Sequence, residues 1–600
     1  MSTTSGTRGG SVIHAAEERT GQVPLARRLL RYVFPEHWSF MWGEIALYCF
    51  VVLVVTGTYL AFFFDPSYRQ VIYHGNYVPL RGQRMSAAYA SALDISWRIR
   101  AGLLMRQTHH WAADIFVASI TVHLLRVFFT GAFRKPREVT YWIGVTLLML
   151  AVLEGYMGYS LVDDLLSGMG LAIGWGVAMS IPVIGGPLAT WLWDGQFPGS
   201  TAFESRLYIA HVFIIPLILA TLIGIHLLFV MLLHHTQFAG RGRREGNVVG
   251  APMWPSYAFR SMGLFAVVAG GLFALGGLVQ INPIWLWGPY HPYIGTSGAQ
   301  PDWYLGWLIG ALRMMPSWEP TIGGYTIVPN PFWGGALFPL VIFGILYLWP
   351  LLERKVTRDR ATHHLLQRPR DAPGRTAVGV AVFTFAAVPF FAGSMDRVYL
   401  QFGIPYEGAV EVMQVLWVVL PIVAGLIALS VCRNLRATEL RPLRGVTARM
   451  VGRAADGGLV AGSSLMANPS WRPDPVPPAP PPAARRGLAE LVEDAAAESA
   501  ALARLEARRG VAEVKGRVQR SGAGVAVIGI GLLLAGVAAT ALVTAIVLAL
   551  GLVMPLWLAA LVTAVALLAA AAVTARLAAR HRRKAPSDYD RSSDPNTSEP

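Results

Sequence analysis

Eight long apolar runs divide the part of the chain before residue 433 into membrane-sized segments. Each run is long enough to cross the hydrocarbon of a bilayer at about 1.5 Å of helix rise per residue. Polar or aromatic stretches separate the runs, so the pattern predicts eight transmembrane helices. The predicted spans are 41–64, 110–130, 140–160, 207–233, 259–280, 333–352, 376–394 and 411–432.

The C-terminal third has a different pattern. A Pro/Ala-rich stretch and a polar stretch rich in Ala, Glu and Arg precede two further apolar spans, 523–549 and 554–577, which predict a membrane hairpin. The expected divisions are 1–30 as a cytoplasmic N-terminal segment, 31–240 as a four-helix bundle, 241–440 as the remaining four helices, 441–486 as a linker, 487–518 as a polar surface helix, 519–584 as a two-helix membrane hairpin and 585–600 as a disordered tail.

Composition supports an all-α integral membrane protein. Hydrophobic residues make up 54% of the chain and charged residues only 14%, against about a quarter in soluble proteins. The formal net charge is +15, but Lys and Arg collect in alternate loops, as in cytoplasmic loops of membrane proteins. This distribution predicts a cytoplasmic N-terminus. No nucleic-acid-binding motif is present, so we expect no nucleic acid partner.

Four of the 14 histidines form matched pairs inside two apolar runs. His109 and His123 lie 14 residues apart on the second predicted helix, and His211 and His226 lie 15 apart on the fourth. At 100° per residue each pair lies along one face to within about 40–60°, separated by about 21–23 Å of rise. Two such helices facing each other can hold two metal centres. Bis-histidine ligation of haem iron leaves no open position and suits electron transfer.

His110 is the rival to His109, although it lies about 140° around the helix from His123 and so on a poorer face. A single intramembrane histidine can also serve as a hydrogen-bond partner of a neighbouring helix. Two matched pairs favour ligands. The two cysteines, Cys49 and Cys432, form no CxxCH motif, so any haem is expected to be bound without that attachment.

Glycines repeat the histidine period on the first and third predicted helices. Gly43 and Gly57 lie 14 residues apart, as do Gly144 and Gly158. Glycine lets a backbone approach a flat macrocycle closely, although small residues also favour ordinary helix packing in membranes. The shared period favours contact with haem.

Two arginines flank the histidines of the second predicted helix. Arg106 precedes His109 by three residues and Arg126 follows His123 by three. Arginine binds carboxylates through two parallel hydrogen bonds, so both residues are candidates to bind haem propionates. Snorkelling toward the membrane surface is an alternative that can coexist with this role.

Several motifs in order resemble cytochrome b of the cytochrome bc and chloroplast-type bf complexes, over roughly residues 30–432. The second span and its following loop read HHWAADIFVASITVHLLRVFFTGAFRKPRE, GYSLVDD follows the third span, and the fourth contains LYIAHVFIIP and a later histidine. QPDWYLGW occupies 300–307. The PDWY sequence, in which Asp replaces the family's usual Glu, and the unbroken eight helices resemble the actinobacterial menaquinol version.

The resemblance implies an eight-helix cytochrome b with a four-helix di-haem bundle and two non-covalent b-type haems. By this resemblance His109 and His211 hold a lower-potential haem near the outer face. His123 and His226 hold a higher-potential haem near the cytoplasm.

The same resemblance assigns Pro301, Asp302, Trp303 and Tyr304 to a quinol-oxidising site, where the carboxylate accepts a quinol proton. Taken alone, these four residues favour a loop turn with interfacial aromatics. Because Asp is one methylene shorter than Glu, the reach of its carboxylate is open. The implied enzyme is a proton-translocating quinol–cytochrome c reductase, with quinol, expected to be menaquinol, as its substrate.

The resemblance also implies a Rieske iron–sulfur subunit and a cytochrome c subunit as partners, a homodimer, and location in a bacterial plasma membrane. One electron of each quinol is expected to pass to the Rieske partner and the other through the haems to an inner quinone site. Candidates for that inner site are His37, Ser39, and His234 or His235, although an interpretation as interfacial polar residues is equally favoured. A supercomplex with a terminal oxidase is a further expectation for the C-terminal extension.

Two other functions compete with this interpretation. A di-haem membrane anchor of a dehydrogenase or hydrogenase would explain the histidines but not PDWY, GYSLVDD or eight helices. A transporter would predict broken helices and inverted repeats, and the sequence shows neither.

Overall fold

The computed structural model describes residues 32–197, 201–295 and 298–455, together with Val562. The predicted surface helix, membrane hairpin and tail lie outside these residues, Val562 excepted, as does the segment 1–30. Contacts divide the chain into two units, and the described residues up to Asp396 and from Trp417 to Ala455 belong to the first. The described residues Arg397–Leu416 and Val562 belong to the second unit.

Eight stretches of the described residues are long and apolar enough to cross a membrane. Each overlaps one of the eight predicted spans, so the predicted number and order of spans are confirmed. They are Trp38–Ala61, Gly102–Phe129, Glu138–Ser160, Ala202–Leu233, Met253–Leu278, Phe332–Thr357, Pro373–Ala392 and Tyr406–Ala437.

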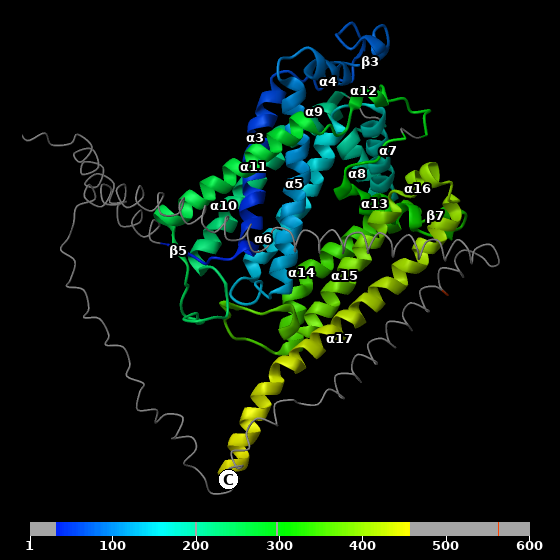
Figure 1. The fold of residues 1–600 in the computed structure, drawn as a ribbon. Coiled ribbons are helices and arrows are strands. Elements are labelled where there is room, and N and C mark those ends of the chain that lie inside the picture. Colours follow the sequence, from blue (N-terminus) through cyan, green and yellow to red (C-terminus); the bar gives the residue numbers. More distant parts are fainter. Residues whose placement is uncertain (1–31, 198–200, 296–297, 456–561, 563–600) are drawn as a thin grey trace, which may run out of the picture. The chain divides into compact units, whose positions relative to one another are not determined.

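The bundle consists of the first four spans, whose main helices are α3, α5, α6 and α10 (Figure 1). Helix α5 packs against α3 on one side and α6 on another, and α10 packs against α6. The short helix α9 and the π-helical turn η3 come before α10 in the chain and extend it toward the preceding loop. The bounds are α3 Met41–Ala61, α5 Gly102–Phe129, α6 Glu138–Ser160, α9 Thr201–Ile209, η3 Ala210–Ile214 and α10 Ile215–Leu233.

Small side chains allow these helices to approach closely. Cys49 and Val52 of α3, Ala112 of α5 and Val145 of α6 are buried in one continuous core with Phe116. Because lipid tails are as apolar as these side chains, close van der Waals packing between the helices is the main stabilising contribution inside the bundle. The core therefore fixes the rotation of α5, which positions its histidines.

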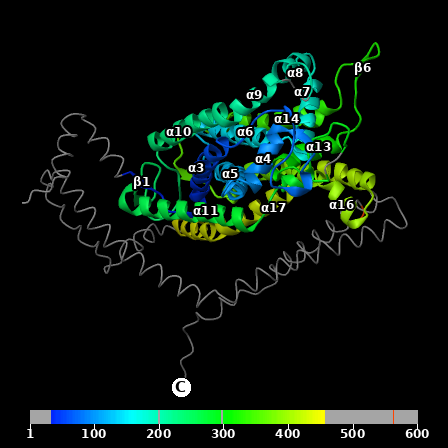
Figure 2. The same ribbon diagram turned by 90° about the horizontal axis from the view of Figure 1, so that it is seen from above.

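Further spans of the first unit pack on this bundle. Helix α11 packs on α5 and α3, and it lies beside them in both views (Figure 2). Helix α14 contacts α6, and α13 packs on α15. The bounds are η4 Met253–Tyr257, α11 Ala258–Leu278, η5 Phe332–Leu337, α14 Phe338–Thr357, α15 Pro373–Ala392, α16 Met395–Phe402 and α17 Tyr406–Ala455.

The structure corrects two details of the predicted organisation. Helix α17 continues to Ala455, so the first residues of the predicted linker 441–486 are helical. Helix α5 begins at Gly102 rather than at 110, because the polar residues Arg106, Gln107 and Thr108 separate its first apolar turn from the long apolar run.

The loops on one side of the spans contain further helices. These helices were missed because they are too short to cross a membrane. Capping side chains start two of them: Ser86 accepts a hydrogen bond from the Tyr89 amide (3.2 Å) and Asp164 from the Ser167 amide (2.8 Å). The bounds are α4 Ala87–Trp97, α7 Leu165–Ser180, α8 Gly185–Trp193, α12 Ile284–Trp287 and α13 Trp303–Met314.

Short strands pair in the loops; β1 with β5 and β4 with β8 join distant loops, and the other two pairs are local. The four strand pairs are β1 with β5, β2 with β3 and β6 with β7, all antiparallel, and β4 with β8, which is parallel. Their bounds are β1 Val33–Phe34, β2 Gln70–Ile72, β3 Arg84–Ser86, β4 Gln237–Phe238, β5 Ala251–Pro252, β6 Thr321–Ile322, β7 Tyr325–Thr326 and β8 Leu365–Leu366, with 3-10 turns η1 Trp38–Phe40, η2 Val78–Leu80 and η6 Pro369–Asp371.

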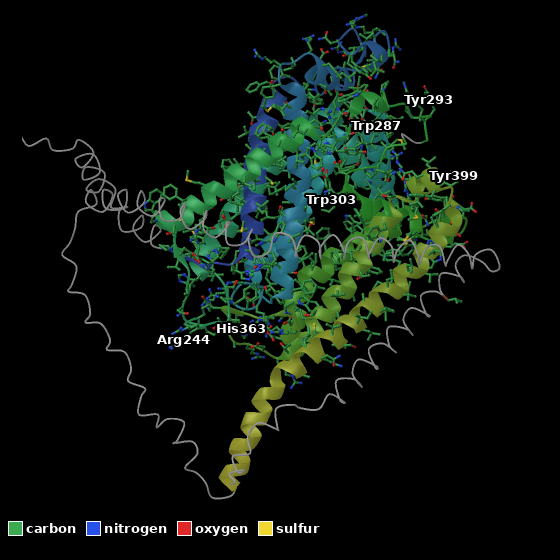
Figure 3. The ribbon with its side chains drawn as sticks, in the orientation of Figure 1. Arg244, Trp287, Tyr293, Trp303, His363 and Tyr399 are labelled. Carbon is green, nitrogen blue, oxygen red and sulfur yellow. The ribbon has the colours of Figure 1, made fainter. Side chains whose placement is uncertain are left out.

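The two ends of the bundle carry different loops. Figure 3 shows Arg244 and His363 at one end and Trp287 and Tyr293 at the other. At the first end the buried Arg137 guanidinium donates hydrogen bonds to the carbonyl oxygens of Leu233 (3.0 Å) and His363 (2.7 Å). This arginine therefore joins the loops after α5, α10 and α14.

Candidate functional site

Two pairs of histidines lie between the helices of the bundle. His109 of α5 and His211 of η3 have ring centroids 6.3 Å apart, with planes at 80°. His123 of α5 and His226 of α10 have centroids 6.5 Å apart, with planes at 71°. Each pair joins two helices, and the pairs occupy two levels along α5.

The separation of the rings fits two imidazoles that share one metal ion. A bond from imidazole nitrogen to a protein-bound metal is about 2.0–2.1 Å long. Two coaxial imidazoles on opposite sides of one ion therefore have centroids roughly 6–6.5 Å apart. Both pairs match this value, so each can hold one iron between its rings.

The partner of His109 fixes which nitrogen faces the gap. The Thr56 hydroxyl donates to the Val52 carbonyl (2.7 Å), and its oxygen lies 2.9 Å from Nδ1 of His109. Because a hydroxyl has one hydrogen to donate, Nδ1 of His109 is then the donor in the second bond. Nε2 therefore keeps its lone pair and is the nitrogen able to coordinate a metal.

His211 has a charged partner instead. Nδ1 of His211 lies 3.0 Å from Oε1 of Glu154, and both side chains are largely buried, with 17% and 15% exposed. A carboxylate on Nδ1 selects the same tautomer, with Nε2 available for a metal.

Each of the four glycines singled out from the sequence faces one histidine ring. A Cβ on Gly57 would lie 3.0 Å from His109, and a Cβ on Gly158 would overlap the ring of His211. A Cβ on Gly43 would lie 3.2 Å from the His123 ring; Gly144 is the most open, with 3.7 Å to the nearest ring atom. The glycines thus make room for the imidazoles.

The guanidinium groups of Arg106 and Arg126 both contain nitrogen atoms without a hydrogen-bond partner among the described residues. Arg106 donates to Ser96 Oγ (3.2 Å) and to the Asn282 carbonyl (3.3 Å), while its Nη2 is buried without a partner among the described residues. Arg126 stacks on Phe40, and its Nε and Nη2 are likewise buried and unpartnered there. Buried cationic donors without partners fit anionic groups such as propionates.

His110 points to a different site from His109. Its Nε2 lies 2.6 Å from Oδ1 of Asp302, and the Tyr304 hydroxyl donates to Oδ2 of the same carboxylate (2.8 Å). Asp302 is the residue before α13, where Asp commonly caps a helix, but here its side chain makes no cap bond. The carboxylate is directed at α5 instead.

A second carboxylate lies in this cluster. Asp114, one turn beyond His110 on α5, has an oxygen within 4.8 Å of the ligand atoms of both His110 and Asp302. Burial raises the pKa of Asp302, but the charge of His110 and the hydrogen bonds from His110 and Tyr304 outweigh burial and hold that pKa below its ordinary value. Asp302 is therefore ionised at neutral pH and able to accept a proton.

Of the other two residues of PDWY, Trp303 is 39% exposed and begins α13. Pro301 is partly buried and precedes the carboxylate. The four residues thus stay together, with Tyr304 buried beneath Asp302.

The candidates for an inner quinone site fall into two groups. His37 Nδ1 lies 2.8 Å from Ser39 Oγ, and its ring lies 4.6 Å from that of Phe238. His234 and His235 instead both contact the ring of Tyr32. Burial, followed by the charge of Arg137, lowers the pKa of His235 to about 4.

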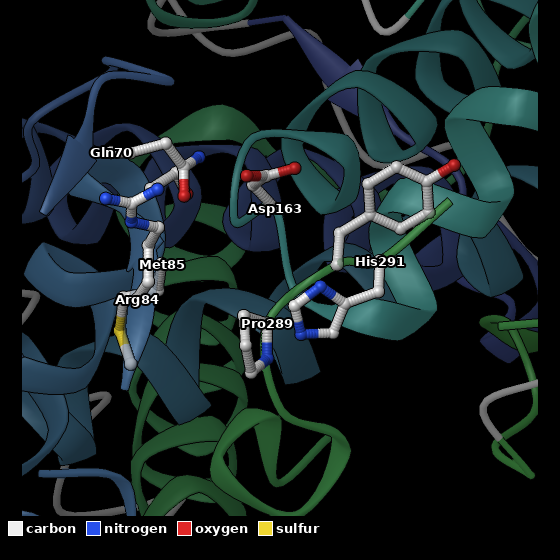
Figure 4. A pocket seen from close by; sticks show the side chains of 8 residues that line it. Gln70, Arg84, Met85, Asp163, Pro289 and His291 are labelled. Atoms are coloured by element: carbon white, nitrogen blue, oxygen red, sulfur yellow. The ribbon is translucent and has the colours of Figure 1, made fainter. Parts of the chain in front are cut away.

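A small polar cavity lies near the end of the bundle that carries Trp287. Its volume is about 170 Å³, and β2, β3, Asp163 and Pro289–His291 line it (Figure 4). Burial and the nearby acidic groups Asp164 and Glu204 raise the pKa of Asp163 to about 7, against a hydrogen bond from Ser86. Asp163 belongs to the GYSLVDD sequence, which therefore forms part of this wall.

Three residues of these clusters were not selected from the sequence: Thr56, Asp114 and Glu154. Glu154 and Asp114 carried a usable signal, because an ionisable residue inside a membrane span is usually functional. Thr56 carried none, since a threonine in a membrane helix most often bonds its own backbone.

Comparison with known proteins identifies the family of this chain. Residues 114–289 match the family described as "Cytochrome b(N-terminal)/b6/petB", and residues 489–592 match the family described as "Putative Actinobacterial Holin-X, holin superfamily III". A solved structure titled "Hyperthermophilic respiratory Complex III" has a TM-score of 0.53 and 19% identity over 70% of this chain and 99% of its own. That likeness supports the fold.

The matches to curated relatives cover most of each relative's own length. The protein named "Cytochrome bc1 complex cytochrome b subunit" of Streptomyces coelicolor is 45% identical over 72% of this chain and 79% of the relative. Those of Mycobacterium tuberculosis (48%, covering 72% and 79%) and Corynebacterium diphtheriae (48%, covering 69% and 76%) bear the same name. The chain is therefore an integral membrane protein that belongs to the haem-b-binding family of cytochrome b subunits of cytochrome bc1 complexes.

Proposed function

We propose that the chain is the di-haem subunit of a quinol–cytochrome c oxidoreductase that oxidises quinol at the outer membrane surface. The proposal rests above all on the two buried histidine pairs, each with the ring separation that one shared iron requires. Membership of the cytochrome b family supports it over a dehydrogenase anchor or a transporter.

The pairs differ in their position relative to the basic loops. His123 and His226 lie toward the end of α5 that leads into the loop with Arg137. Because basic loops face the cytoplasm, these two residues would hold the inner haem, and His109 and His211 the outer one. When bound, the haems carry one electron of each quinol across the membrane, while a Rieske iron–sulfur partner accepts the other.

The remaining residues of each centre bind and orient. Arg106 at the outer level and Arg126 at the inner level offer unpartnered guanidinium nitrogens to the propionates. Gly57 and Gly43 of α3 leave the space that His109 and His123 occupy.

Quinol oxidation is assigned to the Asp302 cluster. A quinol hydroxyl must lose its proton as its electrons leave, and an ionised carboxylate at the edge of the bundle can accept it. His110 contacts one oxygen of that carboxylate, and the Tyr304 hydroxyl donates a hydrogen bond to the other. Pro301 and Trp303 complete the wall beside it. Menaquinol is the proposed substrate, because actinobacterial cytochrome b resembles this chain in its PDWY sequence.

The reaction stores energy because it moves charge across the membrane. Moving one charge against the membrane potential costs about 2.3 kcal/mol per 100 mV, so electrons must fall in energy between the outer and inner centres. Protons released outside and taken up at an inner quinone site, for which His37, Ser39, His234 and His235 are candidates, energise the membrane.

The proposed setting is the plasma membrane of a bacterium, with a cytoplasmic N-terminus. The curated relatives cited above come from bacteria and are named as subunits of a cytochrome bc1 complex. We therefore propose a Rieske subunit, a cytochrome c subunit and a second copy of this chain as partners. A terminal oxidase is a further proposed partner, through the C-terminal extension.

A reduced-minus-oxidised optical spectrum of the purified complex tests this function. Two spectrally or potentiometrically distinct b-type haems, both reduced by quinol, are expected. A complex without b-type haem would overturn the proposal. Haem that only a soluble dehydrogenase substrate reduces would favour the membrane anchor instead.

A further inference from the structure

Glu154 is an acidic residue inside a membrane span with a single evident partner. It belongs to α6, within the span Glu138–Ser160, and its side chain is 15% exposed. Oε1 lies 3.0 Å from Nδ1 of His211, within ion-pair distance but without hydrogen-bond alignment, while Oε2 is buried without a hydrogen-bond partner among the described residues. Ionisable groups within membranes are costly unless paired, so this pairing needs a reason.

The carboxylate distinguishes His211 from the other three candidate ligands. His109 meets a neutral hydroxyl, that of Thr56, at 2.9 Å. In the part of the chain that the structure describes, neither His123 nor His226 has a carboxylate on Nδ1. Among the described residues, therefore, only the outer pair has an anionic partner beside a ligand ring.

A carboxylate that accepts the Nδ1 proton changes a metal-bound imidazole. It raises the basicity of the ligand nitrogen and fixes the orientation of the ring. A more basic ligand and a buried negative charge both stabilise ferric iron relative to ferrous iron, so the reduction potential falls.

We propose that Glu154 is a positioning residue that orients His211 and lowers the reduction potential of the outer haem relative to the inner one. The proposal rests on the function proposed above, in which His211 is a haem ligand. It gives the asymmetry between two otherwise similar bis-histidine centres a cause in one side chain. The downhill step from the outer to the inner haem then depends on this carboxylate.

The test is a redox titration of the intact complex carrying Glu154→Gln, followed by the absorbance of the b-type haems. The amide is nearly isosteric but uncharged. The equilibrium constant for reduction of the outer haem is expected to rise at least tenfold, which is 59 mV for a one-electron couple. Haem content and the inner potential should stay unchanged, and the ferric low-spin resonance of the outer haem should shift.

Glu44→Gln is the matched control. Glu44 is also an acidic residue inside a span, on α3, but its carboxylate accepts hydrogen bonds from Ser261 (2.8 Å) and Tyr48 (3.4 Å) rather than from a candidate ligand. Its replacement should leave the outer potential unchanged. Glu154→Asp keeps the charge, but its side chain is one methylene shorter. We therefore expect the reduction potential of the outer haem to lie between those of the wild type and of Glu154→Gln.

The outcomes separate this inference from the proposed function. Two b-type haems with an unaltered outer potential in Glu154→Gln would overturn the role of Glu154 and leave the function intact. If Glu154→Gln loses the outer haem, the Asp variant decides: an outer potential equal to that of the wild type overturns the proposal. Absence of b-type haem from the wild-type complex would instead refute the function.

Discussion

His110 Nε2 and Asp302 Oδ1 lie 2.6 Å apart, although 192 residues separate them in the chain. This contact directs two adjacent histidines of α5 to different sites. His109 faces His211 inside the bundle, whereas His110 faces the carboxylate that begins α13. One turn of helix thus joins the proposed outer haem to the proposed quinol site.

Replacement of the two adjacent histidines should separate these roles. His109→Ala should remove about half of the haem, because one of two bis-histidine centres loses a ligand. His110→Ala should keep the full haem content and lower the rate of quinol oxidation. Haem content by pyridine haemochromogen and quinol-dependent reduction measure the two effects. Loss of haem in His110→Ala with retention in His109→Ala would reverse the assignment.

The pH dependence of turnover should also respond to His110. Asp302 accepts a proton only when ionised, which requires a pH above its pKa. His110 holds that pKa below its ordinary value, so His110→Ala should raise it and shift the acidic limb of the rate profile to higher pH. Quinol oxidation measured from pH 3 to 9 checks this. A limb that stays in place would show that another group controls the proton.

Asp302→Asn should slow quinol oxidation by about 10²–10⁴-fold, the usual contribution of a positioned proton acceptor. The substitution preserves size and can still accept a hydrogen bond from Tyr304, so haem content and spectra should not change. The matched control is Asp396→Asn, near the start of α16 and bonded to Arg313 (2.8 Å). Normal turnover in Asp302→Asn would remove Asp302 from the proton path.

The two glycines of α6 offer a steric test. In Gly158→Ala the new Cβ would overlap His211, whereas in Gly144→Ala it would lie 3.7 Å from the His226 ring, an ordinary contact. Gly158→Ala should therefore reduce outer haem occupancy strongly, and Gly144→Ala should retain both haems. Alanine is the better helix former by about 1 kcal/mol, so helix propensity does not explain a loss. Equal occupancy in both variants would contradict the proposed ligand geometry.

Asp163, which lines the polar cavity, should make the stability of the folded protein depend on pH. Its folded pKa is raised to about 7 from the model-peptide value of 3.8, so the folded state binds this proton more tightly than the unfolded state. The contribution to stability is present below pH 3.8 and is lost as the pH rises toward 7. Asn tolerates the positive φ of 57° at this position. Asp163→Asn should raise the melting temperature of the purified complex more at pH 8 than at pH 5; an equal change at both would contradict the shift.

The sequence by itself determined the elements with local causes. Apolar runs of membrane length define the eight spans, because hydrocarbon thickness sets a length that can be counted along the chain. Helical periodicity placed His109 and His123 on one face of α5, since 100° per residue is a property of the backbone alone. The short helices α4, α7 and α13 were not predicted because each is shorter than a membrane span, although α7 is apolar.

Only the tertiary structure decided what meets those faces. The bond of His110 to Asp302, the hydroxyl of Thr56 at His109 and the carboxylate of Glu154 at His211 all join residues on different elements. Such contacts depend on the rotation and depth of packed helices, which close packing of the core fixes and spacing along one helix does not contain.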